Sequence, residues 1–280
     1  DIFEKLNRLE EAEVNYRQSI TLDSTFVICH VNLGHLLKKL GRLQEAESCY
    51  RLAINIKPDC GEAIHMLATL TGETTSSAPR NYVEALFDGY AEDFENSLID
   101  QLEYKIPLLI ADMILKNHSD DLLGKVLDLG CGTGLVGKEV KQFCSHLVGI
   151  DLSNSMLEHA RRKDVYDELM QSDILEYLST EDLNFDYFIS ADVFVYMGDL
   201  SEVFRLIKSR NRSGGTLMFS TEHNSKDGFF LEPSGRYSHS KEYIDSLCKE
   251  FDYRLTDFDI CDLRKDNNRV ILGGIYRLDF

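Results

Sequence analysis

The sequence predicts an α/β protein whose mainly parallel sheet is preceded by an all-α region of helical repeats. Three observations lead to this fold class. Residues 1–60 repeat themselves with a period of 34 residues, a length typical of stacked helix pairs. From residue 122 onward, short apolar runs alternate with helical stretches, which favours parallel strands with helices on both faces. A Gly-rich turn also follows the first apolar run, where such sheets bind ligands.

The repeat is visible when Lys5–Ser24 is aligned with Lys39–Pro58, because ten of twenty positions are identical. In the second copy, apolar residues spaced i, i+3, i+4 and i+7 predict one helix, and a second follows Gly41. Six positions of this copy resemble the tetratricopeptide pattern: Leu33, Gly34, Ala46, Tyr50, Ala53 and Pro58. We therefore expect tetratricopeptide-type repeats over residues 1–70, and a Thr/Ser/Gly/Pro-rich linker over 71–81.

The α/β domain is expected over residues 82–280, with a helical entry segment at 82–115, cut by Pro107, and a core at 122–280. The expected strands are Lys125–Leu129, His146–Asp151, Glu168–Ser172, Phe185–Ala191 and Gly215–Thr221. The expected helices are Leu135–Phe143, Asn154–Arg162, Leu200–Lys208 and Lys241–Phe251. Two apolar runs around a polar turn predict a closing antiparallel hairpin: Tyr253–Ile260, Arg269–Leu278 and, between them, Asp262–Asn268.

The Gly-rich turn reads DLGCGTG over residues 128–134. Its glycines allow a tight turn and a close approach of backbone to a ligand, and the following helix offers free N–H groups. Asp151 ends the second strand, twenty-one residues after Gly130. That spacing places a carboxylate beside the ribose hydroxyls of a ligand lying over the turn.

Two ligand classes fit this turn. Gly132–Gly137 also matches the G-x-G-x-x-G dinucleotide pattern, which is a weak signal by itself. Asp128 discriminates, because a carboxylate two residues before the first glycine would repel a pyrophosphate and suits an ammonium group. Further acids follow the later strands, at Asp151, Asp173 and Asp192. This acidic set favours a cationic ligand such as S-adenosylmethionine.

The glycine turn and the strand that follows it resemble a known family. DLGCGTG followed by GIDLSNSML is similar to the class I S-adenosylmethionine-dependent methyltransferases. Three further segments resemble the predicted methyltransferases that carry tetratricopeptide repeats: Tyr82–Pro107, Ala191–Leu200 and Pro233–Ser240. The resemblance covers essentially the whole chain. It implies a Rossmann-like seven-stranded methyltransferase sheet with the last strand antiparallel.

The resemblance also implies a donor site. The glycines would pack against the methionine and ribose of the donor, and Asp128 would lie near its amino group. Asp151 would hold the ribose hydroxyls, while Asp173 and the Ile174 N–H would meet the adenine. Met156 is either an adenine contact or a core residue, and Tyr90 and Phe94 form either a lid on the donor, as the resemblance implies, or a core stripe. The full expected set is Asp128, Gly130, Gly132, Gly134, Asp151, Leu152, Met156, Asp173, Ile174, Asp192 and Tyr90.

The acceptor site is less defined. The segment after the fourth strand lacks the Asn/Asp-Pro-Pro-aromatic signature of exocyclic-amine and glutamine-amide methyltransferases. Methyl transfer from a sulfonium depends mainly on positioning, so a base is optional. The catalytic candidates are His239, Tyr237 and Asp192; His239 is either a general base near neutral pH or a histidine of a polar loop. The other candidates for the acceptor pocket are Tyr90, Phe94, Tyr196, Glu222, His223 and Arg236.

The charge balance and the cysteine spacing restrict the partners and cofactors that the chain is expected to bind. The formal net charge of −18 makes nucleic acid an unlikely partner, since phosphate binding needs a basic face. The seven cysteines form no C-x-x-C pair, which predicts reduced thiols in the cytoplasm and no zinc or other metal site. No apolar run reaches the roughly 20 residues that a membrane span needs.

The sequence is compatible with three functions. The first is a methyltransferase that uses S-adenosylmethionine on an unidentified small-molecule or protein acceptor, with the repeats recruiting a partner. The alternative is a repeat scaffold with a non-catalytic cofactor-binding domain. The complete set of glycines and acids argues against the scaffold hypothesis. A nicotinamide-dependent enzyme is disfavoured by Asp128 and by the closing hairpin.

Overall fold

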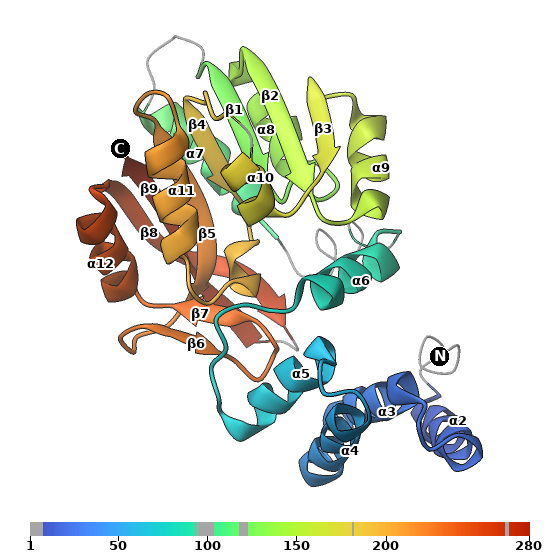
Figure 1. The fold of residues 1–280 in the computed structure, drawn as a ribbon. Helices are drawn as coiled ribbons and strands as arrows, with labels where there is room; N and C mark the ends of the chain where they lie inside the picture. Colours follow the sequence, from blue (N-terminus) through green and yellow to red (C-terminus); the bar gives the residue numbers. More distant parts are fainter. Residues whose placement is uncertain (1–7, 93, 95–103, 118–122, 181, 267–268) are drawn as a thin grey trace. The chain divides into compact units, whose positions relative to one another are not determined.

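The structure is a computed structural model that describes residues 8–92, 94, 104–117, 123–180, 182–266 and 269–280 (Figure 1). The chain divides into two compact units. The first comprises Asp1–Thr75 together with Leu231–Gly235, and the second comprises Ser76–Phe230 and Arg236–Phe280.

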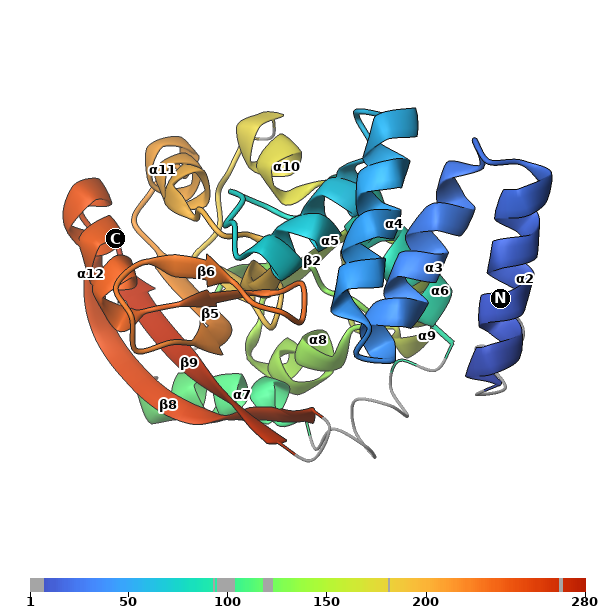
Figure 2. The ribbon, with the colours of Figure 1, turned by 90° about the horizontal axis from the view of Figure 1, so that it is seen from below.

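The first unit is an array of α-helices in which each helix packs on the next (Figure 2). Its helices are α2 (Leu9–Leu22), α3 (Val27–Lys39), α4 (Leu43–Ile56) and α5 (Gly61–Thr71). Gly34 is needed where α3 crosses α4, because a Cβ on it would lie 2.5 Å from the Tyr50 ring. Ala46 and Tyr50 are fully buried in the same interface. The helix pair expected from the apolar spacing is therefore confirmed.

The second unit is built on a mixed β-sheet. Its strands are β1 (Lys125–Leu129), β2 (His146–Asp151), β3 (Glu168–Gln171), β4 (Tyr187–Ser190), β5 (Thr216–His223), β6 (Phe229–Leu231), β7 (Tyr237–His239), β8 (Arg254–Asp266) and β9 (Arg269–Asp279). The order β3-β2-β1-β4-β5 is parallel throughout, and β9 pairs antiparallel with both β5 and β8. The central strands are buried on both faces, which explains their nearly continuous apolar sequences.

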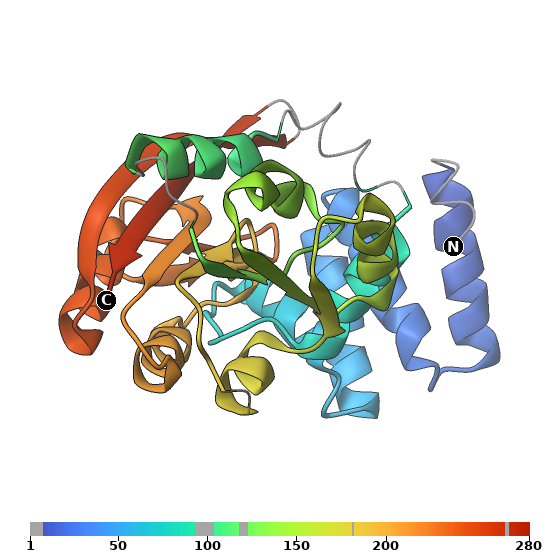
Figure 3. The ribbon, with the colours of Figure 1, turned by 90° about the horizontal axis from the view of Figure 1, so that it is seen from above.

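Helices cover both faces of this sheet (Figure 3). The α-helices of the unit are α6 (Arg80–Tyr90), α7 (Ile106–Asn117), α8 (Leu135–Val140), α9 (Asn154–Lys163), α10 (Ile174–Thr180), α11 (Ser201–Arg210) and α12 (Lys241–Phe251). Two short 3-10 helices are η2 (Lys141–Phe143) and η3 (Phe194–Tyr196). One core cluster joins the sheet to α10, α11 and α12, and a second joins it to α7 and α8. The helix α6 lies at the carboxyl ends of the parallel strands (Figure 1).

Three expectations about the fold need correction. The described residues form nine strands rather than seven, because β6 and β7 add to the sheet beyond the end of β4, where β5 is still unpaired on that side. Pro107 does not cut a helix but lies in the first turn of α7, where a missing N–H costs nothing. The segment expected as the polar turn Asp262–Asn268 is strand as far as Asp266, since pairing with β9 continues there.

Candidate active site

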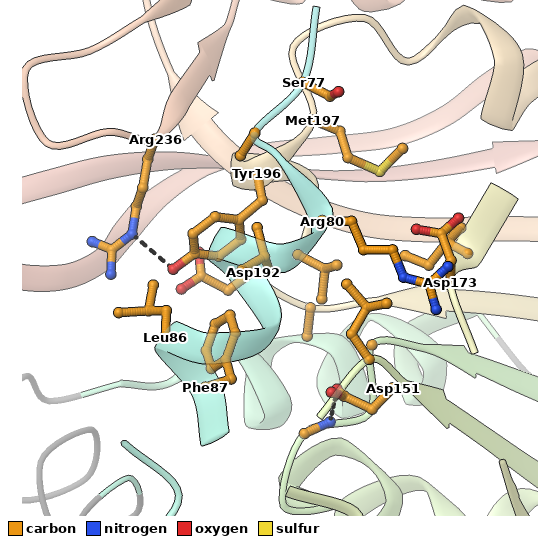
Figure 4. A pocket seen from close by; sticks show the side chains of 18 of the residues that line it. Ser77, Arg80, Leu86, Phe87, Asp151, Asp173, Asp192, Tyr196, Met197 and Arg236 are labelled. Carbon is orange, nitrogen blue, oxygen red and sulfur yellow. Dashed lines mark hydrogen bonds between the residues drawn. The ribbon is translucent and has the colours of Figure 1, made fainter. Parts of the chain in front are cut away.

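A cavity of about 530 Å³ lies at the carboxyl edge of the parallel strands, within the second unit. Its wall includes Gly130 and Gly132 after β1, Asp151 and Leu152 at the end of β2, and Asp192 after β4. Figure 4 shows Asp151 and Asp173 at one side of this cavity, and Asp192, Tyr196 and Arg236 at the other. We call these sides the donor end and the acceptor end.

The Gly-rich turn brings backbone to the donor end. Gly130 and Gly132 have φ values of 74° and 54°, in the left-handed region that favours glycine. A Cβ on Gly130 would lie 2.5 Å from the Val193 side chain, so a larger residue would displace this wall. A Cβ on Gly132 would meet only Phe94, at 3.9 Å, so the backbone at Gly132 is open to a ligand.

Asp151 is fixed by two backbone donors. The Gly132 N–H donates to its Oδ2 at 2.8 Å, and the Ser153 N–H donates to its Oδ1 at 2.8 Å. Desolvation nevertheless raises the pKa of this carboxyl to about 6. A carboxylate oxygen accepts more than one hydrogen bond, so both oxygens can still receive hydroxyl groups from the cavity.

Asp128 lies behind the turn and not on the cavity wall. It is 1% exposed; its Oδ2 accepts a hydrogen bond from the Tyr166 hydroxyl at 2.7 Å, and its Oδ1 is buried without a partner. Burial raises its pKa to about 7. Gly134 is also away from the wall, at the start of α8, and it packs against the Tyr166 ring.

Asp173 follows β3 and lines the cavity together with Ile174. Its Oδ1 accepts the N–H groups of Leu175 at 2.8 Å and Glu176 at 3.1 Å, which caps the start of α10. Met156 is fully buried in α9 and is not on the wall, so the structure places it in the core.

The entry segment supplies an aromatic wall. Phe87 and Tyr90 of α6 line the cavity, as do Phe94 and Tyr104. Phe94 packs edge-on against the Tyr90 ring with centroids 5.7 Å apart. The residues between Phe94 and Tyr104 lie outside those that the structure describes.

The acceptor end contains a buried ionic cluster. Arg264, on β8, is 3% exposed, and its Nη1 donates to both carboxylate oxygens of Asp192 at 3.0 and 3.1 Å. Its Nη2 donates to Glu222, which is buried at the end of β5. Asp192 has a φ of 59°, and its N–H donates to Ser220 Oγ at 2.8 Å. A non-glycine residue in this region is uncommon, and such residues gather at functional sites.

Arg236 and Tyr196 complete this end. Arg236 Nε donates to the Tyr196 hydroxyl at 3.3 Å, and both residues line the cavity (Figure 4). The Tyr196 ring also packs edge-on against Phe87, with centroids 5.4 Å apart. A positive group and a phenol therefore line this end of the cavity.

His239 and Tyr237, expected as catalytic residues, are not on the cavity wall. His239 is fully buried: its Nδ1 bonds with Thr221 Oγ1 at 2.5 Å, and its Nε2 bonds with the Gly198 carbonyl at 2.9 Å. Burial lowers its pKa to about 4. With both ring nitrogens occupied, His239 has no contact with the cavity through which it could remove a proton. Glu222 and His223 are also absent from the wall.

Sequence reasoning missed two charged residues of this site. Arg264 lies in the segment expected to be a polar turn, and Arg80 lies in the expected linker. A single arginine in a polar segment is normally predicted to lie on the surface, so no local feature of the sequence identifies Arg264 or Arg80 as a site residue. Among the described residues, no group of three or more His, Cys, Asp or Glu is able to hold a metal ion.

The residues at the donor end fit the donor expected from the sequence. Gly132 leaves open space above the backbone, and the carboxylates of Asp151 and Asp173 line the same cavity. The Oδ1 of Asp128 is buried without a hydrogen-bond partner among the described residues, but it lies behind the turn and not on the cavity wall. No described helix has the length and apolar character needed to cross a membrane.

Comparison with known proteins agrees with this geometry. A family model described as a methyltransferase domain matches residues 121–268, and a tetratricopeptide repeat model matches residues 1–26 and 29–60. The first match covers more than half of the chain. The chain therefore belongs to the methyltransferase-domain family, with tetratricopeptide repeats in front, and the expected resemblance is confirmed.

Two relatives illustrate the match. The malonyl-[acyl-carrier protein] O-methyltransferase of Bacillus cereus is 25% identical over 145 residues, which are 51% of this chain and 53% of that protein. The protein of the same name from Legionella pneumophila is 29% identical over 175 residues, 59% of each chain. The matched region thus spans only about half the length of these relatives.

Solved structures show the same fold. A methyltransferase from Leishmania major, described as dependent on S-adenosylmethionine, aligns with a TM-score of 0.55 at 12% identity, covering 72% of this chain and 83% of that one. The magnesium protoporphyrin IX methyltransferase of Synechocystis, solved with bound S-adenosylhomocysteine, aligns with a TM-score of 0.53 at 14% identity, covering 71% and 98%. At such identities the likeness establishes the fold alone.

Proposed function

We propose that this chain binds S-adenosylmethionine at the donor end of the cavity and transfers its methyl group to an acceptor held at the acceptor end. The observation that carries the proposal is that the glycine turn, Asp151 and Asp173 line one wall of a single cavity. The donor supplies an electrophilic methyl group on a sulfonium. The protein positions the two reactants and excludes water, which can contribute roughly 7–11 kcal/mol to lowering the barrier.

Each donor residue then has a role. Asp151 holds the ribose hydroxyls, and Asp173 accepts from the adenine amine while the Ile174 N–H meets the ring. Leu152 packs beside the ribose, and Tyr90 covers the donor. Gly130 and Gly132 lie under the methionine part. Asp128 attracts the ammonium group from behind the turn; Gly134 and Met156 support the site through packing.

Asp192 lies at the acceptor end of the cavity. Its carboxylate is oriented by Arg264, so it can accept a hydrogen bond from an acceptor hydroxyl or amine without rotating away. We assign no general base to His239, because its ring is bonded on both sides and its pKa is low. The acceptor is an unidentified small molecule or protein group.

The repeats are proposed to recruit a partner protein, since tetratricopeptide arrays present a surface of paired helices that commonly serves this purpose. The cytoplasm is the proposed compartment, because all seven cysteines are unpaired thiols. The strongly acidic balance makes nucleic acid a poor partner.

Calorimetric titration with S-adenosylmethionine and S-adenosylhomocysteine tests the proposal. Micromolar binding of both, with loss of binding in Asp151→Ala, supports the donor site; Asp182→Ala, an exposed acid paired with Arg212, is the matched control. Labelled donor then allows a search for the acceptor. If the wild type binds no donor at millimolar concentration, the proposed methyltransferase function is wrong and the repeat scaffold is favoured.

A further inference from the structure

The helix α6 crosses the cavity and contacts both of its ends. Val83, Leu86, Phe87 and Tyr90 of this helix line the cavity wall, and Phe87 packs on Tyr196 at the acceptor end. A ligand at the donor end would therefore be covered by α6. What holds this helix in place decides how easily the donor exchanges.

One contact joins α6 to the donor loop. Asp88 Oδ1 accepts a hydrogen bond from Ser153 Oγ at 2.6 Å and a longer one from the Ser155 N–H at 3.4 Å. The Ser153 hydrogen bond lowers the pKa of Asp88, so this carboxylate is ionised at neutral pH. A hydrogen bond to an ionised acceptor is stronger than one between neutral groups.

Ser153 links three parts of the donor end. Its hydroxyl donates to Asp88 on α6 and accepts from the Met156 N–H at 3.1 Å, which caps α9. Its own N–H donates to Asp151 Oδ1 at 2.8 Å. Ser153 alone therefore connects Asp151, the carboxylate proposed to hold the ribose, with Asp88 on α6.

A second contact lies at the other end of α6. Arg80 Nη1 is 3.1 Å from Glu176 Oε2, three residues after Asp173. Both side chains are more than half exposed, and such surface pairs contribute little. The Asp88 contact is shorter and part-buried, so it is the stronger of the two.

We propose that Asp88 is a donor-positioning residue that latches α6 over the donor end through Ser153. The proposal rests on the function proposed above. We call the hydrogen bond between Asp88 and Ser153 the latch. The latch keeps α6 over the donor end, fixes Ser153 and through it Asp151, and slows the exchange of donor and product. Asp88 itself touches neither reactant.

The rate at which bound radiolabelled S-adenosylhomocysteine leaves the full-length protein tests the latch. We expect Asp88→Ala to speed dissociation about five- to tenfold, because one charge-assisted hydrogen bond is lost. Asp88→Asn should restore most of the slow release, since its amide oxygen accepts the same hydroxyl. Glu84→Ala is the matched control, because among the described residues Glu84 makes no ion pair or hydrogen bond.

Wild-type release from Asp88→Ala, or equal release from the Ala and Asn variants, overturns the latch while leaving donor binding intact. If the wild type binds neither donor nor product, the proposed function fails instead. Amide hydrogen exchange of the unliganded protein still tests the contact in that case. Faster exchange in α6 and at the start of α9 in Asp88→Ala supports the latch, and unchanged exchange overturns it.

Discussion

The two ends of the cavity are held in different ways. At the donor end, Asp151 and Asp173 bind backbone N–H groups of residues close to them along the chain or in the neighbouring turn. At the acceptor end, side chains bind side chains: Arg264 pairs with Asp192, 72 residues away, and with Glu222, 42 residues away. The donor end thus depends on the geometry of strand ends, whereas the acceptor end depends on individual long-range partners.

This difference has a consequence for substitution. Backbone donors survive most changes of side chain, so the donor end should tolerate changes outside its carboxylates and glycines. The acceptor end depends on a compensated charge cluster, where removing one member leaves the others buried and unpaired. We therefore expect the two ends to respond separately to single substitutions.

Arg264→Met should give the largest effect. It leaves Asp192 and Glu222 without their shared cation, and we expect a loss of roughly 3–5 kcal/mol in the free energy of unfolding. Donor affinity should change less than about twofold. Denaturant unfolding and calorimetry measure the two quantities. Arg205→Met is the control, because its exposed pair with Glu202 should cost below about 1 kcal/mol. A large loss of donor affinity in folded Arg264→Met would contradict the separation of the ends.

Asp151→Ala should lower donor affinity and leave the stability of the protein almost unchanged. Donor affinity is expected to fall by tens to hundreds of times, corresponding to roughly 2–3 kcal/mol, since two charge-assisted hydrogen bonds to the ribose are lost. The unliganded protein should change little in stability. The variant loses two backbone hydrogen bonds, but it also loses a carboxylate that burial disfavours, since desolvation raises its pKa to about 6. Unchanged donor affinity would remove Asp151 from the site.

Asp128→Asn tests the buried acid behind the turn. Burial raises the pKa of Asp128 from 3.8 to about 7, so the folded protein binds this proton more tightly than the unfolded chain does. Its contribution to stability is full below about pH 4 and is lost as the pH rises through 7. We therefore expect Asp128→Asn to gain on the order of 2 kcal/mol over the wild type at pH 8, and less at pH 5. Thermal melts across this range measure the gain.

The same variant should bind the donor more weakly, because the proposed attraction of the ammonium group by a carboxylate behind the turn is lost. Asp164→Asn is the matched control: this exposed acid ends α9 in the left-handed region, which asparagine also tolerates. A wild-type melting profile that is independent of pH would show that Asp128 is paired in solution.

Tyr196→Phe should give the smallest effect. It removes the hydroxyl that accepts from Arg236 Nε at 3.3 Å but keeps the ring contact with Phe87. We expect a loss of roughly 0.5–1 kcal/mol in unfolding free energy and no change in donor affinity. If donor affinity falls more than about threefold, Tyr196 contributes to donor binding. The two ends of the cavity would then not respond separately to substitution.

Much of the fold was predictable because the relevant signals are local. The strand Lys125–Leu129 and the helix Lys241–Phe251 were expected with the bounds that the structure has, since apolar runs and helical spacing report burial directly. The small strands β6 and β7 were not expected. Each has three residues, which is too short for a period to be visible, and they form only because β5 extends beyond β4.

The sequence by itself determined the repeats, the order of the longer strands and helices, and the glycines and acids expected at the donor end, because each is encoded within a few consecutive residues. The tertiary structure alone decided the acceptor end. It buried His239 away from the cavity, brought Arg264 to Asp192 and Glu222, and joined Asp88 to Ser153. These contacts join residues 42 to 72 positions apart, or 41 in the case of His239 and Gly198. No local spacing carries such information, because only the pairing of whole strands and helices sets which side chains meet.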